Sequence, residues 1–410
     1  DGRVIIQKHG YRYLIQNKPA LPLTQEQMDE VYNLPYTRTW HPKYDGKGVP
    51  ALAEVQFSLV SQRGCFGSCN FCAITNHQGR IIQNRSHDSL IKEAKQMVAM
   101  PNFKGYIHDV GGPTANFRHL ACPKQAQFGA CKGRTCAAPV PCENLDTSHE
   151  DYLALLRKLR KLKGVKKVFV RSGLRYDYVL LDKNKEFVRE LCEHHVSGQL
   201  KVAPEHISKR VTNMMGKAGK EEFLKFKDWF EEANRQLGKK QYLVPYFMSS
   251  HPGCTLEDAI ELAEFLRDQH MYPEQGQDFI PTPGSLSTAM YYTGINPLTG
   301  KSVYCAKKGR DKAKQRALMQ YKNSENYALV REALIEANRR DLIGFDPECL
   351  IPPRPMSRHK GSGTHGHSRT GESNNRSQGK HYARRYTTAK KEINRGRRTF
   401  IGRDSTRRGH

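Results

Sequence analysis

The sequence predicts an α/β fold in the form of an open, partial barrel of six strand–helix units. Short apolar, strand-like runs alternate with amphipathic, helix-like segments from about residue 54 to residue 280. This alternation is typical of a parallel sheet covered by helices, and six units are too few to close a standard eight-unit barrel. Charged, hydroxyl or glycine residues follow nearly every predicted strand, and in such folds the chemistry gathers at the carboxyl ends of the strands.

Each element follows from its own local pattern. The predicted strands are residues 54–60, 104–110, 165–171, 199–203, 241–248 and 277–280. The predicted helices are residues 86–100, 149–163, 183–195, 220–237 and 256–269. Ser86 or Asp88 is the expected N-cap of the first helix, because short polar side chains accept hydrogen bonds from its first turn. Gly164 is expected to end the second helix, since glycine readily adopts the left-handed conformation found there.

We expect four regions along the chain. Residues 1–50 form an N-terminal extension, residues 51–300 the α/β core with a cysteine-rich insertion at 120–144, and residues 301–356 a helical extension. Residues 357–410 hold 15 Lys and Arg against 3 Asp and Glu, and few aliphatic side chains. Such a segment buries too little surface to fold, so we expect a disordered basic tail. Because the chain begins with Asp1 rather than Met, we expect an upstream domain to be missing.

Composition and charge indicate which kinds of protein this chain can be. The 410 residues carry a net charge of +26, with no secretory signal and no apolar run of about 18 residues. We therefore expect no membrane span and a cytoplasmic location. Eleven cysteines in a long chain of this kind predict metal ligands rather than disulfides. The basic tail predicts contact with nucleic acid, although a merely solvated segment would have the same composition.

Three cysteines, Cys65, Cys69 and Cys72, follow the first predicted strand and are separated by three and two residues, with Gly67 in the first gap. Three thiolates can hold three irons of a [4Fe–4S] cluster and leave the fourth iron open. An open iron can bind S-adenosylmethionine (SAM) through its amine and carboxylate, and a reduced cluster can cleave the carbon–sulfur bond of SAM. The alternative is a structural zinc site, for which His77 lies near enough in sequence to be the fourth ligand.

Candidate SAM-binding residues follow the later strands. The backbone of Gly111 and Gly112 is predicted to face the SAM amine, unless the pair is an ordinary tight turn. Arg175 or Lys201 is predicted to bind its carboxylate, and Glu205 or Ser172 its ribose. These side chains come from different predicted units, so the pocket is expected only where the strand ends meet. His206 and His251 are candidate proton donors, or packed histidines with no such role.

A second group of cysteines, Cys122, Cys131, Cys136 and Cys142, lies in a segment rich in proline and glycine. The composition predicts a loop rather than a helix, and a loop of this length inside a compact domain needs an internal tie. Four thiolates on an auxiliary iron–sulfur cluster or a structural zinc would supply it. The alternative is a set of free thiols. Cys192, Cys254, Cys305 and Cys349 are scattered and expected to be structural.

The motif Arg63-Gly-Cys-Phe-Gly-Ser-Cys-Asn-Phe-Cys72 resembles the radical SAM superfamily. More narrowly, residues 1 to about 355 resemble the YgiQ family through residues 77–85, 110–116, 172–177, 201–206 and 290–294. The resemblance implies a partial (β/α)6 barrel, SAM binding and cluster ligation by Cys65, Cys69 and Cys72. It also implies an electron donor such as flavodoxin or ferredoxin, and cobalamin only where a cobalamin-binding-like upstream domain is present. Pro113 stands where many superfamily members have glutamate.

Three functions are compatible with these patterns. The leading one is a radical SAM enzyme that acts on an unknown substrate, with RNA modification or methyl transfer as candidates. The second is a zinc-stabilised nucleic-acid-binding protein without catalysis. The third is a regulatory or damaged homologue that keeps the cluster without turnover. The lack of a fourth thiolate in the first cysteine motif favours the enzyme.

Overall fold

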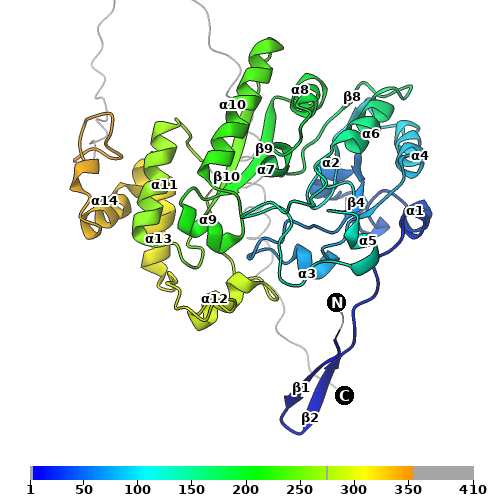
Figure 1. Cartoon of the computed structure of the whole chain (residues 1–410). Helices are drawn as coiled ribbons and strands as arrows, with labels where there is room; N and C mark the ends of the chain where they lie inside the picture. The colour runs from blue at the N-terminus through cyan, green and yellow to red at the C-terminus, as the bar shows by residue number, and fades with distance from the viewer. Residues whose placement is uncertain (1–2, 274–275, 354–410) are drawn as a thin grey trace, which may run out of the picture. The chain divides into compact units, whose positions relative to one another are not determined.

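The computed structural model describes residues 3–273 and 276–353 (Figure 1). The chain divides into two units, Asp1–Met356 and Ser357–His410. The predicted basic tail of residues 357–410, with its predicted contact to nucleic acid, lies outside the described residues. The architecture below is therefore that of the first unit.

Six parallel strand positions follow one another in chain order. β3 (Ser58–Val60) pairs with β7 (Asp109–Gly111), and β6 (Tyr106–Ile107), one residue before β7, pairs with β8 (Lys167–Val168). A parallel bridge between Leu174 and Val202 leads to β9 (Gln199–Glu205). β9 pairs with β10 (Tyr242–Ser249), which pairs with β11 (Gln277–Asp278). The predicted α/β class and the order of six parallel strands are thus confirmed.

Several strands are shorter than the sequence predicts, whereas β9 extends two residues beyond the predicted end at residue 203. Residues 54 and 55 end the helix α2 (Pro50–Val55) instead of opening the first strand. Pro50 occupies the first turn of this helix, where its fixed φ is favourable and its missing N–H has no partner to lose. The predicted strand 165–171 keeps only the two residues of β8, and the predicted strand 104–110 is interrupted at His108 between β6 and β7.

The predicted helices are present with small changes at their ends. They are α4 (His87–Val98), α6 (Glu150–Arg160), α10 (Lys220–Gln236) and α11 (Leu256–Asp268). Ser86, not Asp88, is the N-cap of α4, since its hydroxyl accepts a 3.1 Å hydrogen bond from the N–H of Ser89. The predicted helix 183–195 begins later, as α8 (Glu186–Glu190), and continues as a π-helical turn, η2 (Leu191–His195).

Further elements surround these units. Two antiparallel pairs are formed by β1 (Ile5–His9) with β2 (Arg12–Gln16) and by β4 (Gln62–Arg63) with β5 (Gln83–Asn84). The additional helices are α1 (Gln25–Asn33), α3 (Ile74–Gln78), α5 (Lys124–Phe128), α7 (Tyr176–Val179), α9 (Lys209–Met215), α12 (Leu286–Thr293), α13 (Gly309–Met319) and α14 (Tyr327–Glu336). Short 3₁₀ turns lie at Pro42–Tyr44, Ser324–Asn326 and Arg340–Leu342.

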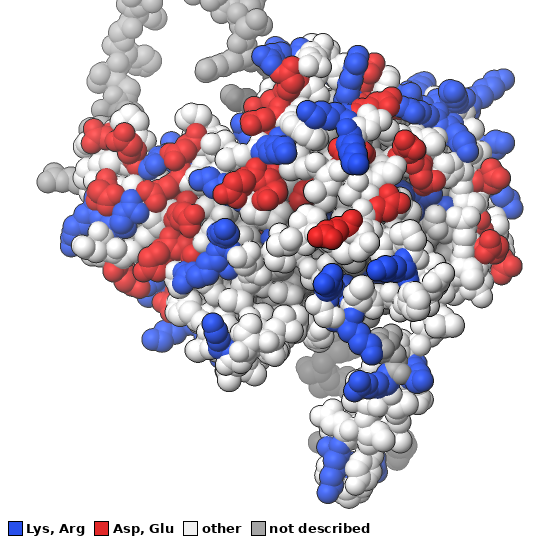
Figure 2. Space-filling view, viewed as in Figure 1, with Lys and Arg blue, Asp and Glu red and all other residues white. Residues whose placement is uncertain are grey.

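The core lies between the parallel strands and the helices that follow them. Its members include Leu59, Val110 and Val202 from the strands and Leu156 and Phe226 from the helices. Figure 2 shows Lys and Arg beside Asp and Glu over much of the visible surface, whereas the hairpin of β1 and β2 carries only Lys and Arg among its charged side chains. None of the helices in the described ranges is both long and apolar enough to cross a membrane.

Candidate functional site

The first three cysteines lie on a loop that leaves β4. The loop closes on itself, because the N–H of Cys65 donates to the carbonyl of Gly79 (3.0 Å) and that of Cys72 to the carbonyl of Cys69 (3.1 Å). Gly64 has φ +86°, and a Cβ at this position would lie 2.2 Å from the carbonyl oxygen of Ile81. Only glycine fits there, so the entry to the loop is determined by backbone sterics.

The three thiols are half-buried and have polar neighbours from other units. The Sγ of Cys65 lies 3.5 Å from the Oγ1 of Thr114, and the Sγ of Cys69 accepts a 3.5 Å hydrogen bond from the Nη1 of Arg175. Burial raises the pKa of the Cys69 thiol, and the positive charges of Lys217 and Arg175 oppose that rise. The two cations therefore stabilise the thiolate form that a metal requires.

Arg175 is predicted to bind the SAM carboxylate, but most of its guanidinium is already engaged. Its Nε and Nη2 donate to the two carboxylate oxygens of Asp177 at 2.8 and 2.6 Å. The backbone N–H of Arg175 donates to the Oδ1 of Asn116 (3.0 Å). A Cβ at Gly67 would lie 2.6 Å from Nη1, so glycine is required where the cysteine loop passes the guanidinium. Only Nη1 remains directed at the loop.

Lys217 is a cation of this site that the sequence analysis missed. Its side chain is 5% exposed, and in the described part of the chain its ammonium makes no hydrogen bond or ion pair. The backbone N–H of Asn70 donates to the carbonyl of Met215 (2.8 Å) and its Nδ2 to that of Met214 (2.9 Å). Gly216, at φ +68°, ends α9 in the left-handed conformation. The segment that carries Lys217 is thus bound directly to the cysteine loop.

The two predicted residues on β9 differ in position. Glu205 lies at the end of the strand with φ +67°. Burial raises the pKa of its carboxyl, while the positive charges of Lys217 and Arg175 oppose that rise. Lys201 is exposed on the same strand. The structure therefore brings Glu205, Arg175 and the thiols together and leaves Lys201 apart from them.

Gly111, Gly112 and Ser172 are packed tightly against their neighbours. A Cβ at Gly111 would lie 2.2 Å from the Oγ of Ser172, and one at Gly112 would lie 2.7 Å from the carbonyl oxygen of Gln62. Ser172 donates its hydroxyl to Asp109, whose Oδ1 also accepts the Ser172 N–H at 3.0 Å. Steric crowding alone accounts for both glycines, and the Ser172 proton already has an acceptor.

His206 and His251 are packed inside the protein. The Nδ1 of His206 accepts the N–H of Ser208 (3.1 Å), and the Nε2 of His251 lies 2.7 Å from the Oγ of Ser287. Burial lowers the pKa of His206 to about 4 and that of His251 to about 3. Both imidazoles are therefore neutral near pH 7, so each ring carries one N–H rather than two. The ring of Phe71 packs edge-on against His251, so that this histidine borders the cysteine loop.

The second group of cysteines lies in the predicted insertion. The segment contains one short helix, α5, where the sequence analysis expected only loop; Pro123 at its N-cap position is compatible with a helix start. Cys136 is buried, Cys122 and Cys142 are half-buried, and Cys131 is exposed. Cys136 and Cys65 join one apolar cluster around the stacked rings of Phe66 and Phe117.

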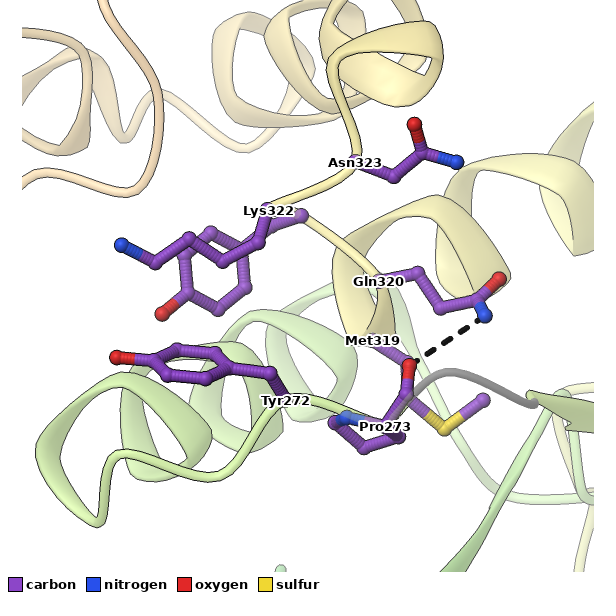
Figure 3. A pocket seen from close by; sticks show the side chains of 7 residues that line it. Tyr272, Pro273, Met319, Gln320, Lys322 and Asn323 are labelled. Carbon is purple, nitrogen blue, oxygen red and sulfur yellow. Dashed lines mark hydrogen bonds between the residues drawn. The ribbon is translucent and has the colours of Figure 1, made fainter. Parts of the chain in front are cut away.

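Two cavities lie away from the three-cysteine loop. The larger, of about 340 Å³, lies beside the ring of Tyr272, with the ammonium of Lys322 5.2 Å from the ring centroid (Figure 3). None of the predicted site residues lines it. The smaller, of about 240 Å³, lies between the second cysteine segment and α10. Its lining consists of Ala137, Pro139, Pro141, Asp177, Leu180, Leu181, Ala218, Glu221, Glu222 and Lys225.

The donor set fits an iron–sulfur cluster in its chemistry. Among the described residues, no three Cys, His, Asp or Glu side chains form a ready-made site for a single metal ion. The loop nevertheless presents three thiols, and two buried cations favour the thiolate form of Cys69. Thiolates that hold different irons of one cluster do not converge on a single ion.

Comparison with known proteins places this geometry in a family. Models described as "Radical SAM N-terminal", "Radical SAM superfamily" and "Domain of unknown function (DUF3362)" match residues 1–58, 59–266 and 274–408. A UPF0313 protein of Clostridium botulinum (strain Okra / Type B1) is 59% identical over 352 residues, which are 86% of this chain and 55% of that protein. A UPF0313 protein of Clostridium perfringens (strain 13 / Type A) is 54% identical over 374 residues, 91% of this chain and 56% of that protein. The chain thus spans about half the length of these relatives.

Solved structures give weaker likenesses. The cobalamin-dependent SAM radical enzyme OxsB, with aqua-cobalamin bound, has a TM-score of 0.41 at 12% identity over 69% of this chain and 34% of its own. The radical SAM methyltransferase TsrM from Kitasatospora setae, with cobalamin and a [4Fe–4S] cluster bound, has a TM-score of 0.37 at 14% identity over 57% of this chain and 38% of its own. The family match rests on the sequence models. Since the superfamily model covers about half of the chain and includes all three cysteines of the first loop, this chain belongs to the radical SAM superfamily of enzymes, as its motif predicted.

Proposed function

We propose that this chain binds a [4Fe–4S] cluster through Cys65, Cys69 and Cys72 and cleaves SAM reductively to act on a further substrate. The observation that carries the proposal is the loop of three thiols beside the buried cations of Arg175 and Lys217. When bound, the cluster supplies the electron that breaks the carbon–sulfur bond. The residues around it hold the thiolates, orient SAM and limit access of water.

The roles of the surrounding residues follow from their free atoms. We assign the SAM carboxylate to Lys217 and the Nη1 of Arg175, because both are buried cations whose charges act on the Cys69 thiol. Glu205 is the candidate for the ribose hydroxyls, and Ser172 can only accept a hydrogen bond while it donates to Asp109. The carbonyl of Gly111 already accepts hydrogen bonds from the N–H (2.7 Å) and hydroxyl (3.2 Å) of Ser61, so the carbonyl of Gly112 is the remaining candidate for the amine. Lys201 is the least supported of the predicted residues, since it is exposed.

The experiment that tests the proposal is electron paramagnetic resonance on anaerobically reconstituted protein, reduced, with and without SAM. We expect a reduced four-iron signal that changes on addition of SAM, because SAM binds the open iron. Zinc in place of iron, in a colourless protein, would instead support the alternative of a nucleic-acid-binding protein without catalysis. A cluster signal that does not change on addition of SAM would contradict the proposal that SAM binds the open iron.

Lys217→Ala is expected to weaken SAM binding about 10- to 100-fold, because a hydrogen bond to a charged group contributes about 1.5–3 kcal/mol. The measurement is equilibrium binding of SAM to the reconstituted, oxidised protein. Lys201→Ala is the matched control, since it removes a lysine from the exposed side of β9 and should leave binding nearly unchanged. A larger loss in Lys201→Ala than in Lys217→Ala would return the carboxylate to Lys201.

For the substrate we propose RNA, and a basic surface supports this class. Residues 157–167 contain seven Lys and Arg and no acidic residue. Lys161, Lys163, Lys166 and Lys167 among them are exposed. Phosphate contacts from such residues make binding sequence-independent and salt-dependent. Methyl transfer is the candidate reaction only for a longer protein that also holds cobalamin.

Replacing Lys161, Lys163, Lys166 and Lys167 by glutamate should weaken binding of a transfer RNA by at least about 10-fold at low salt. It should also lower the slope of the logarithm of affinity against the logarithm of salt concentration by up to about four. Filter binding over a salt series measures both. The matched control is Lys225, Lys227, Lys239 and Lys240 changed to glutamate, which alters net charge equally on α10 and just beyond it. Equal effects of the two sets would show that net charge alone attracts RNA.

A further inference from the structure

The segment that follows β11 returns to the three-cysteine loop. It belongs to the region that matches a domain of unknown function, residues 274–408. Ser287 lies in the first turn of α12, where the N–H groups of a helix have no partner within the helix. Its N–H donates instead to the carbonyl of Asn70, inside the loop, at 2.9 Å. The Nδ2 of Asn76 donates to the carbonyl of Gly284, so the two segments meet at two points.

The side chain of Ser287 makes a second connection to the loop, through His251. Both side chains are fully buried. The Nδ1 of His251 lies 2.8 Å from the carbonyl of Pro252, which can only accept a hydrogen bond, so Nδ1 carries the one N–H of the neutral ring. The Nε2 therefore accepts the hydroxyl hydrogen of Ser287, at 2.7 Å. The same ring packs edge-on against Phe71, with 6.0 Å between the ring centroids and 82° between the planes.

His251 is itself held by a second residue of the region of unknown function, Gln315 on α13. The Oε1 of Gln315 accepts the N–H of Ser250 at 3.0 Å, and its Nε2 donates to the carbonyl of Cys254 at 2.9 Å. This buried amide therefore brackets the turn that carries His251. Ser250 has φ +61°, which residues other than glycine rarely adopt, so the turn depends on contacts of this kind. Ser287 and Gln315 together determine where the imidazole lies.

We propose that Ser287 is a positioning residue of the iron–sulfur site, which makes the region of unknown function part of that site. The inference rests on the proposed ligation of the cluster by the three-cysteine loop. The N–H of Ser287 holds Asn70, and its hydroxyl, by way of His251, holds Phe71. These are the two residues directly before Cys72. An apolar ring fixed beside Cys72 limits the access of water to its sulfur, and burial of the sulfurs helps to set the potential of a cluster.

The test compares Ser287→Ala with Ser285→Ala in the reconstituted full chain. Ser285 is the matched control, because its hydroxyl caps the same helix by accepting the N–H of Thr288 at 3.2 Å and makes none of the described contacts with the loop. In Ser287→Ala alone, we expect a more positive midpoint potential of the cluster, because water stabilises the added negative charge of the reduced state. A redox titration followed by electron paramagnetic resonance measures it. Loss of iron to a chelator should also be about 10- to 100-fold faster, the range found when outer contacts of a metal site are removed. Equal values in both variants would overturn the proposal.

A second measurement keeps the test decisive where Ser287→Ala takes up no cluster. Hydrogen exchange of the metal-free full chain reports the contacts of Ser287 with Asn70 and His251 without iron. Amides of residues 70–78 should exchange about 10-fold faster in Ser287→Ala than in Ser285→Ala, because the buried Nε2 of His251 loses its donor. Exchange at the rate of the unchanged chain would overturn the proposal. Failure of the proposed function is recognised separately, as an unchanged chain that takes up no four-iron cluster, and that result would overturn both.

Discussion

Cys65→Ala, Cys69→Ala or Cys72→Ala alone is expected to reduce SAM cleavage to background. The reason is that a four-iron cluster with one open iron already has the fewest protein ligands, so loss of one thiolate leaves two irons without a protein ligand. The measurement is 5′-deoxyadenosine formation by the reduced, reconstituted chain, together with iron content.

Two controls accompany these variants. Cys349→Ala removes a cysteine outside both groups and should retain cleavage. Deletion of residues 357–410 should also retain it, since no predicted site residue lies there. Loss of cleavage on that deletion would contradict a catalytically dispensable tail. Full cleavage in any one of the three loop variants would remove that cysteine from the ligand set.

Asp177→Ala is expected to lower the free energy of unfolding by about 3–5 kcal/mol, the cost of leaving a buried ionic partner uncompensated. The side chains of Arg175 and Asp177 are only 6% and 8% exposed, and their pair is bidentate. Removing the carboxylate also frees the guanidinium that faces Cys69. Denaturant unfolding of the metal-free chain, followed by circular dichroism, measures the effect.

The matched control is Glu186→Ala, which breaks an exposed ion pair with Arg157 and should cost at most about 1 kcal/mol. The pair also predicts a pH dependence. Burial would raise the pKa of Asp177, but the charge and hydrogen bonds of Arg175 lower it overall. A lowered pKa in the folded state contributes stability above the ordinary pKa of 3.8, and this contribution is lost as the pH falls through the lowered value. Equal losses in the two variants, or no acid dependence on Asp177, would contradict this account.

Much of the fold can be predicted from the sequence, because its signals are local. The order of six strand–helix units follows from alternating apolar periodicity. The start of α4 follows from Ser86, whose hydroxyl accepts a hydrogen bond from the backbone N–H three residues later. The lengths of the strands are harder to predict from the sequence. Residues 52–60 are mostly apolar and fit a strand, but Pro50 starts a helix that takes the first part of that run. Local composition does not decide between the two states here, and none of the residues of α2 is buried.

The candidate site, like the fold, can be predicted only in part from the sequence. The spacing of Cys65, Cys69 and Cys72 is a local pattern, so the sequence by itself determines which thiols share one loop. The sequence also determines that polar residues follow the strands. It does not determine which lysine faces the thiols. β9 directs Lys201 outward, whereas the contact of Asn70 with the end of α9 places Lys217 beside Cys69. That contact joins segments more than 140 positions apart, and only tertiary packing brings them together. Tertiary burial also sets the role of Arg175. Because a buried guanidinium needs a nearby carboxylate, its fork pairs with Asp177, two residues further along the chain.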